Sequence, residues 1–191
     1  MQRFDLNQIV PSPWKNGGGS TREIACFPAG AGMDSFGWRI SVATIAQAGP
    51  FSAFAGVDRQ ITLLDGDGVH LHSADGQINH ALDQRWKPFA FSGDVALDCT
   101  LLGGTSTDFN VMTRRDAWVA KVMVVSAEQT SKANYLTPAG LCMVLDGSWS
   151  CAETGDTLDS GQGVWWTQEQ MLTLAPQEPQ ARLVFVGIAP K

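Results

Sequence analysis

Hydrophobic and polar side chains alternate along most of this chain, in short runs that are separated by turn residues. Between residues 38 and 46, Trp38, Ile40 and Val42 alternate with polar or small residues, which is the period of two of a half-buried β-strand. Few stretches have the period of 3.6 that an α-helix needs, so the chain is predicted to be all-β. The other expected strands are 60–64, 69–72, 89–91, 95–102, 109–113, 120–126, 141–145, 163–167, 172–174 and 183–188.

A short motif, an apolar strand followed by an Asp-Gly turn, occurs twice. Residues 61–66 (ITLLDG) and 142–147 (CMVLDG) each precede another strand and a second turn that contains glycine. Short strands with regular turns are typical of sandwiches and barrels, and the repeat predicts two packed cupin-type barrels, a bicupin. We expect the first barrel at 1–115 and the second at 116–191, with strands that can exchange between the halves. The second copy contains no histidine and few charges at its turns, so we expect the functional site in the first barrel.

Composition and charge argue against several classes of function. The 191 residues have a net charge of −6 and no run of Lys or Arg, which disfavours nucleic-acid binding through phosphate contacts. A small anion can still bind where a pocket concentrates arginines. The N-terminus lacks the pattern of a signal peptide, and no apolar run approaches the roughly 18 residues of a membrane span. The four cysteines form no Cys-x-x-Cys pair, so we expect buried, reduced thiols in a cytoplasmic protein.

Residues 14–23 (WKNGGGSTRE) contain three consecutive glycines. Exposed N–H groups in such a loop can form an anion-binding nest. Asn16 adds a neutral hydrogen-bonding group, Arg22 adds a planar guanidinium suited to a carboxylate, and Trp14 would supply an apolar wall. The alternative is a tight surface turn in which Arg22 and Glu23 are structural, and the residues alone do not decide between the two. No Gly-Lys-Ser/Thr follows at the spacing of a phosphate loop.

Residues 49–59 (GPFSAFAGVDR) place Phe51 and an Asp-Arg pair just before a strand. In one interpretation Asp58 orients Arg59, or another arginine, toward a ligand. In the other interpretation the pair is a structural ion pair at the start of the strand.

Residues 107–115 (TDFNVMTRR) form an expected strand on which Asp108, Asn110 and Met112 share one face. If that face lines a barrel interior, the buried Asp and Asn need polar partners, and Arg39 and Arg59 are the candidates. The alternative is an edge strand with a solvated polar face.

His70 and His72 share one face of an expected strand, a spacing that can bind a metal. Metal-binding cupins carry such a pair on an earlier strand, followed by a glutamate, and the corresponding later positions here are Gly76 and Gln77. The segment 51–59, where the pair is expected, contains no histidine. We therefore favour solvent-facing histidines and expect no metal and no other cofactor.

No motif marks a catalytic nucleophile. The chain has no Gly-x-Ser-x-Gly elbow, and no local feature marks one of the cysteines as activated. We assign no catalytic residue, and the residues favour a protein that is not an enzyme.

Four ordered segments together resemble the HutD/Ves family: 14–24 (WKNGGGSTREI), 38–45 (WRISVATI), 49–59 and 108–114 (DFNVMTR). The resemblance covers essentially the whole chain, and the triple glycine favours the HutD branch over the Ves branch. It implies a cupin-like (RmlC-like) bicupin without the usual metal ligands. It also implies a link to histidine utilisation, which HutD proteins are thought to moderate by binding urocanate or a formylated product. No well-established reaction comes with the family.

The first hypothesis is therefore a ligand-binding regulator. A carboxylate such as urocanate, formate or N-formylglutamate would bind in the first barrel to Arg39 and Arg59, with Asp58 and Asp108 holding the arginines in place. The full set of expected ligand-binding residues is Trp14, Asn16, Arg22, Arg39, Ser41, Phe51, Asp58, Arg59, Asp108, Asn110 and Met112.

Two alternatives belong to other classes of function. A metal-independent cupin enzyme acting on the same metabolites would use a carboxylate whose pKa is raised by desolvation, and the candidates are Glu23, Asp58 and Asp108. A protein-interaction module would expose an aromatic patch, unless the tryptophans concerned form the barrel core: Trp118, Trp149, Trp165 and Trp166. By analogy with cupin-like barrels, we expect a homodimer.

Overall fold

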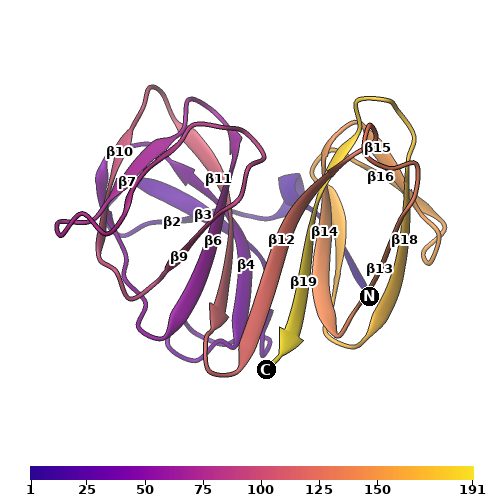
Figure 1. Ribbon diagram of the computed structural model, residues 1–191, viewed down its shortest axis with the longest axis horizontal. Helices are drawn as coiled ribbons and strands as arrows, with labels where there is room; N and C mark the ends of the chain where they lie inside the picture. Colours follow the sequence, from indigo (N-terminus) through magenta and orange to yellow (C-terminus); the bar gives the residue numbers. More distant parts are fainter. The chain divides into compact units, whose positions relative to one another are not determined.

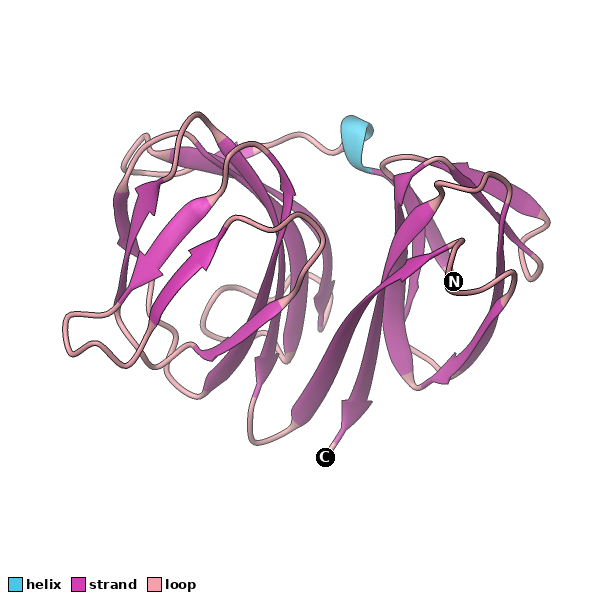
Figure 2. Cartoon of the chain, turned by 45° about the horizontal axis from the view of Figure 1, so that its top comes forward, coloured by secondary structure: helices cyan, strands magenta, loops and turns pink.

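The computed structural model describes residues 1–191, and it confirms that the chain is all-β (Figure 2). The one helix is a 3-10 turn, Leu6–Gln8, and no helix has the length and hydropathy that a membrane crossing requires. Contacts within the chain define two compact units, which we call the first unit (residues 10–117) and the second unit (residues 1–9 and 118–191). Figure 1 labels their strands, and none of the four sheets closes on itself.

The first unit consists of a six-stranded and a four-stranded antiparallel sheet. The strand order is β2-β3-β4-β11-β6-β9 in the larger sheet and β5-β10-β7-β8 in the smaller one. The larger sheet contains β2 (Ser12–Pro13), β3 (Gly19–Phe27), β4 (Trp38–Ile45), β6 (Val57–Asp65), β9 (Phe89–Ser92) and β11 (Ser106–Arg114). The smaller sheet contains β5 (Gly49–Phe51), β7 (Val69–His72), β8 (Asn79–Leu82) and β10 (Leu97–Leu101).

Side chains from both sheets form the apolar core of the first unit. Ile61 and Leu63 of β6 are buried in one cluster with Leu71 of β7, Leu97 of β10 and Ile45 of β4. Successive side chains of a strand point to opposite faces of its sheet. The residues of β4 and β6 that share the parity of this cluster therefore point into the same interior, where the candidate site lies. So do the β11 residues that pair with them.

The second unit has the same two-sheet plan. Its five-stranded sheet has the order β1-β17-β14-β19-β12, and its four-stranded sheet has the order β13-β18-β15-β16. The larger sheet contains β1 (Gln2–Asp5), β12 (Trp118–Ser126), β14 (Ala139–Asp146), β17 (Gln162–Trp166) and β19 (Arg182–Pro190). The smaller sheet contains β13 (Ala133–Thr137), β15 (Ser148–Cys151), β16 (Asp156–Asp159) and β18 (Gln170–Pro176).

The N-terminal strand belongs to the second unit. Residues 2–5 pair with β17 in an antiparallel register that joins Phe4 to Gly163. Phe4 packs so closely on Gly163 that an added Cβ would lie 2.6 Å from its ring. The sequence analysis placed these residues in the first barrel. The pairing with β17 could not be predicted, because a short strand gives no indication of a partner that follows it by more than 150 residues.

The two Asp-Gly turns of the sequence repeat follow equivalent strands, β6 and β14. Gly66 and Gly147 both adopt a positive φ, +91° and +65°, which side chains with a Cβ rarely tolerate. A Cβ on Gly66 would also lie 2.1 Å from the backbone oxygen of Thr105. Glycine is therefore required where each of these hairpins turns back. All four cysteines are free and buried, as predicted.

Candidate functional site

A cavity of about 660 Å³ lies in the first unit, and eight of the predicted ligand-binding residues line it. They are Trp14, Asn16, Arg39, Ser41, Phe51, Arg59, Asn110 and Met112. The lining residues that the sequence analysis did not select are Ser12, Pro13, Lys15, Thr21, Met33, Ala43, Pro50, Ser52 and Phe54.

The alternation read from the sequence determines which side chains face the cavity. On β4, Arg39 and Ser41 line it, while Trp38 points to the opposite face of the sheet and is fully buried. On β11, Asn110 and Met112 line it. The antiparallel register brings Met112 beside Arg59 of β6, and Asn110 beside Ser41 of β4, so polar groups of three neighbouring strands converge.

Arg59 is the buried cation of the cavity, with only 7% of its surface exposed. Its Nη1 donates to the backbone oxygen of Ser52 at 3.0 Å, and its Nη2 donates to Asn110 Oδ1 at 3.5 Å. The guanidinium lies over the rings of three phenylalanines, at 4.5 Å (Phe51), 5.4 Å (Phe54) and 5.0 Å (Phe91). Its Nε has no hydrogen-bond partner, and no carboxylate contacts it.

Burial and, to a smaller extent, the positive charge of Arg39 together lower the pKa of Arg59 to about 10. The guanidinium is still protonated at neutral pH. A buried charge without a partner of opposite sign is costly. The cavity therefore holds a cation that an incoming anion would neutralise.

Arg39 is the second cation of the cavity, and its guanidinium is already paired with the carboxylate of Glu23. Its Nε donates to Glu23 Oε2 at 2.6 Å, and its Nη1 donates to Ser41 Oγ at 3.3 Å. The Glu23 side chain is 47% exposed, whereas that of Arg39 is 13% exposed. Glu23 thus neutralises Arg39 from the solvent side, and Arg59 keeps its full charge in the interior.

The glycine loop positions Trp14. The Gly17 N–H donates to the backbone oxygen of Trp14 at 3.0 Å, and the Gly18 N–H donates to Asn16 Oδ1 at 3.0 Å. Two of the N–H groups that a nest would offer are therefore used inside the turn. A Cβ on Gly19 would lie 3.0 Å from the indole of Trp14 and 2.3 Å from the backbone oxygen of Thr44. The loop is thus a tight turn of the β2–β3 hairpin whose third glycine leaves room for the tryptophan wall.

The HutD family model matches residues 6–184 of the chain. The chain belongs to the HutD family. Curated relatives named Protein Ves agree with this assignment. The one from Citrobacter koseri is 39% identical over 189 residues, which is 98% of this chain and 94% of the relative. The one from Escherichia fergusonii is 38% identical over 175 residues, which is 91% of this chain and 87% of the relative.

Solved structures show the same fold. HutD from Pseudomonas fluorescens matches with a TM-score of 0.82 and 28% identity, over 100% of this chain and 98% of that one. A conserved protein of unknown function from Pseudomonas aeruginosa matches with a TM-score of 0.84 and 30% identity, over 98% and 97%. A cupin 2 conserved barrel domain protein from Leptotrichia buccalis, at 10% identity and a TM-score of 0.60 over 98% and 96%, shows that the fold is of cupin type.

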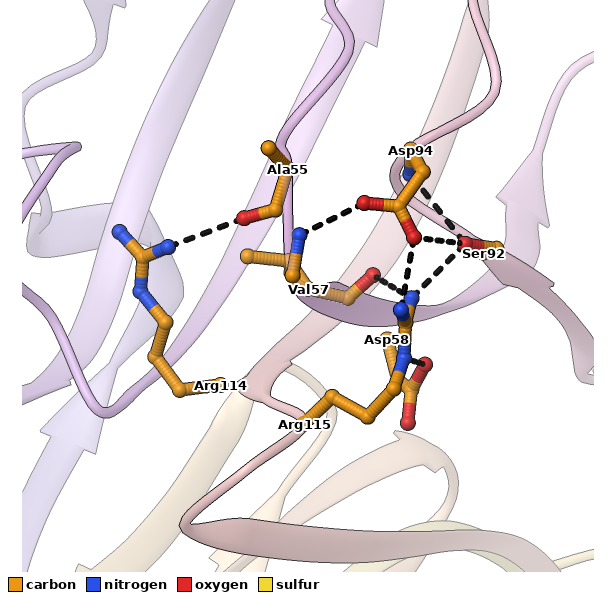
Figure 3. Close-up of polar contacts among 8 residues, drawn as sticks. Ala55, Val57, Asp58, Ser92, Asp94, Arg114 and Arg115 are labelled. Atoms are coloured by element: carbon orange, nitrogen blue, oxygen red, sulfur yellow. Dashed lines mark hydrogen bonds and ion pairs between the residues drawn. The ribbon is translucent and has the colours of Figure 1, made fainter.

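Two of the acidic residues predicted to hold the arginines of this HutD-family chain do not contact them. Asp58 accepts from Arg115 Nε at 2.6 Å instead (Figure 3). It alternates with Arg59 along β6, and the two side chains therefore point to opposite faces. Asp108 accepts from Ser106 Oγ at 3.1 Å. Neither carboxylate lines the cavity, and neither does Arg22, which is adjacent to the lining residue Thr21 and points to the other face of β3.

Asp108 is the buried acid of the first unit. It has no exposed surface, and its Oδ2 has no hydrogen-bond partner. Desolvation raises its pKa to about 7, although the hydrogen bond from Ser106 opposes this effect. Its backbone oxygen accepts from Asn110 Nδ2 at 3.2 Å. Asp108 therefore helps to hold Asn110, a residue that does line the cavity.

The histidines lie away from this cavity and make contacts of their own. His70 and His72 are half-buried on the face of β7 opposite to the core residues Val69 and Leu71, with their rings stacked at 5.3 Å. They are therefore not fully solvent-facing. His70 Nε2 lies 2.6 Å from Asn79 Oδ1, and no group of three or more potential metal ligands is present.

Two of the four tryptophans considered for an interaction surface are core residues of the second unit. Trp149 is fully buried and Trp166 is 2% exposed, and both belong to its apolar cluster. Trp118 and Trp165 are half-buried. The barrel-core alternative therefore holds for Trp149 and Trp166.

Four of the nine lining residues that the sequence analysis missed come from irregular segments: Lys15, Met33, Ser52 and Phe54. Met33 lies between β3 and β4, where no periodicity indicates which side chains turn inward. Ser52 and Phe54 lie within the 49–59 segment, which ends in Arg59. They could have been selected because they are close in sequence to that arginine. Ala43 shares the parity of Arg39 and Ser41 on β4, so stricter use of strand alternation would have found it. Thr21 pairs with Ala43 across the strands, and that pairing is not visible in the sequence.

Proposed function

We propose that this chain is a bicupin whose first unit binds a small carboxylate and thereby moderates histidine utilisation. The two-barrel arrangement is supported by the sequence repeat and by the similar two-sheet plan of the two units. The regulatory role is supported by membership of the HutD family.

The observation that carries the proposal is the environment of Arg59. A guanidinium has five N–H donors in a planar fork that matches a carboxylate. Here the fork is buried, is surrounded by aromatic rings, and keeps an Nε–H without a partner. Arg59 lines the cavity, so an anion that entered it would contribute the missing negative charge and accept hydrogen bonds from the guanidinium. Charge-assisted hydrogen bonds of this kind contribute about 1.5–3 kcal/mol each.

The size and the lining of the cavity favour a planar organic acid such as urocanate. Cavities of a few hundred Å³ with aromatic walls and a few polar groups are typical of small-molecule sites, and this one has about 660 Å³. Trp14, Phe51 and Phe54 offer flat apolar surfaces, while Asn110 and Ser41 offer directional hydrogen bonds. Formate is a smaller candidate that would leave most of the space empty, and the Pseudomonas fluorescens HutD structure is described as a formate condition. N-formylglutamate would bring a second carboxylate, for which Lys15 is an exposed cation in the lining.

The enzyme alternative has less support from the geometry. A general base must lie within hydrogen-bond reach of the bound substrate. Asp58 and Asp108 do not line the cavity, and Glu23 is bound to Arg39.

Thermal unfolding with urocanate, formate, N-formylglutamate, histidine and glutamate tests the proposal. A ligand at about 100 times its Kd stabilises a folded protein by about 2.7 kcal/mol, so binding of one pathway anion raises the Tm in a dose-dependent way. Arg59→Met should abolish the shift without lowering the Tm of the unliganded protein, because it removes a buried charge that lacks a counterion. Arg85→Met, which changes an exposed arginine outside the cavity, should keep the full shift. An unchanged shift in Arg59→Met would refute the assignment of the cavity.

A further inference from the structure

Two irregular segments supply cavity residues that no β-ladder holds in place. Residues 28–37 connect β3 to β4 and carry Met33, and residues 52–56 connect β5 to β6 and carry Ser52 and Phe54. A small apolar cluster lies beneath them, formed by Cys26, Phe36, Val57 and Met112 with Ala31 and Phe54 packed against it. Because Met112 and Phe54 also line the cavity, the positions of the two segments determine the shape of its wall.

The side chain of Arg114 joins these two segments. Its Nε donates to the backbone oxygen of Phe36 at 3.3 Å, and its Nη2 donates to that of Asp34 at 2.7 Å. Its Nη1 donates to the backbone oxygen of Ala55 at 3.0 Å, as Figure 3 shows. The guanidinium carbon lies 5.3 Å from the centre of the Phe36 ring. One fork therefore binds three carbonyl groups, two from the first segment and one from the second.

The next residue holds the second segment from its other side. The Arg115 N–H donates to the backbone oxygen of Gly56 at 2.9 Å, and its Nη2 donates to that of Val57 at 3.1 Å. Asp94, which is paired with Arg115, accepts the Gly56 N–H at 2.6 Å. Figure 3 shows the Arg115 guanidinium bound to the backbone oxygen of Val57 and to Asp94. Among these bonds, those of Arg114 alone tie this segment to residues 28–37.

The second segment also contacts the buried cation directly. Ser52 accepts from Arg59 Nη1 through its backbone oxygen, and the Phe54 ring lies 5.4 Å from the Arg59 guanidinium carbon. A displacement of Ala55 therefore reaches Arg59 through at most three residues of chain. We propose that Arg114 is a positioning residue, which orients Arg59 for the anion by clamping the two loops. This inference rests on the proposed function.

The clamp depends on the shape of the guanidinium as well as on its charge. A lysine ammonium carries its three donors on a single nitrogen and cannot reach carbonyls of two separate segments in the way that a planar fork does. Arg114→Lys and Arg114→Met should therefore have similar effects. This pair of variants also tests a competing explanation, in which Arg114 attracts the anion only through its positive charge.

The experiment compares Arg114→Met, Arg114→Lys, wild type and Asp67→Ala. Asp67 is the matched control, because its Oδ2 accepts the Gly104 N–H at 2.7 Å and so joins two other loops of the same unit away from the cavity. Amide hydrogen exchange of the unliganded proteins reports loop opening. Calorimetric titration with urocanate reports affinity, at a temperature well below the Tm of every variant.

We expect faster exchange in 28–37 and 52–57 in both Arg114 variants, and a urocanate Kd about tenfold higher or more, as lost preorganisation of the site predicts. Asp67→Ala should bind like wild type. Unchanged exchange in the two segments, or faster exchange with an unchanged Kd in a protein that binds urocanate, would overturn the proposal. So would full recovery of affinity in Arg114→Lys. If wild type binds none of the pathway anions, the proposed function fails, and the exchange data alone then decide whether Arg114 clamps the loops.

Discussion

The two units have similar arrangements of strands, but the first buries many polar side chains and the second buries almost none. Nine polar or charged side chains are buried in the protein, and eight of them belong to the first unit: Ser41, Arg59, Thr62, Ser73, Ser106, Asp108, Asn110 and Thr113. The second unit buries Ser126 alone. Its main cluster consists of apolar side chains and two cysteines that behave as small hydrophobic residues.

The sequence repeat allows the two interiors to be compared position by position. If Ile61 is aligned with Cys142, Arg59 corresponds to Gly140. In the sheets, Arg59 pairs with Phe91 and Gly140 pairs with Trp166. A Cβ on Gly140 would lie 2.7 Å from the indole of Trp166. An aromatic side chain thus fills the second unit at the position where the first unit holds its arginine.

The neighbouring strands repeat the contrast. Asp108 pairs with Leu63 in the first unit, and Leu183 pairs with the equivalent Val144 in the second. By the same registers, the counterpart of Asn110 is Phe185, which stacks on Tyr135 at 3.7 Å. One framework therefore accommodates either a closed apolar core or an open polar site. Natural proteins commonly give up stability at functional sites in this way.

The largest effect is expected when a carboxyl is placed in the second unit at the position that Asp108 occupies in the first. Leu183→Asp places a carboxyl in a core that offers it no polar partner, and Leu183 is 1% exposed. We expect a loss of about 4 kcal/mol or more in the free energy of unfolding. Denaturant unfolding followed by tryptophan fluorescence measures it. Leu136→Asp, at a leucine of the same unit that is 56% exposed, should change stability by no more than about 0.5 kcal/mol. Similar losses in both variants would show that the second core is not specifically intolerant of charge.

The reverse experiment removes the buried acid from the first unit. Asp108 has a pKa of about 7 in the folded protein and about 3.8 as the reference for an exposed aspartate. Because the folded state holds the proton more tightly, the stabilisation is fully present below pH 3.8 and is lost as the pH rises through about 7. Asp108→Asn should remove this pH dependence and raise the free energy of unfolding at pH 8 by about 2–4 kcal/mol.

Unfolding curves at pH 5 and pH 8 test this prediction, with Asp98→Asn as the control at an exposed aspartate of β10. The difference in stability between Asp108→Asn and wild type should be smaller at pH 5 than at pH 8. A difference that does not depend on pH would mean that Asp108 titrates normally and that burial alone does not perturb it.

Most of the fold follows from local patterns in the sequence. Alternation identified β4 and β11 and assigned the correct faces, because both strands have one side that lines the cavity. The Asp-Gly turns at Gly66 and Gly147 are visible because a positive φ requires a particular residue. The partner of β1 is not visible, since the register of a short edge strand depends on contacts with residues that lie far away in the sequence.

The candidate site could be predicted only in part, for a related reason. Strand parity put Arg39 and Asn110 on the faces that line the cavity. Arg59 was selected only as part of an Asp-Arg pair, and the same sequence proximity misassigned Asp58. Adjacent residues of a strand point to opposite faces, so Asp58 cannot orient its neighbour and instead bonds Arg115. Arg114 ends the 108–114 segment that resembles the family, but its contacts are with backbone carbonyl groups of two irregular segments. Every residue has such a carbonyl group, so the sequence does not indicate these contacts.

The smallest loss in the free energy of unfolding is expected for substitution of Trp166, whose side chain fills the second unit at the position that Arg59 occupies in the first. Trp166→Phe removes part of the indole and its hydrogen bond from Nε1 to the backbone oxygen of Thr137, and we expect a loss of about 1–2 kcal/mol. Gly140→Ala should then cost less in the Trp166→Phe background than in wild type, because one of its two close contacts is relieved. A double-mutant cycle of unfolding free energies measures this coupling. Additive losses would show that the indole does not pack on Gly140 as described, and that the glycine is required only by its 2.4 Å approach to the backbone oxygen of Val186.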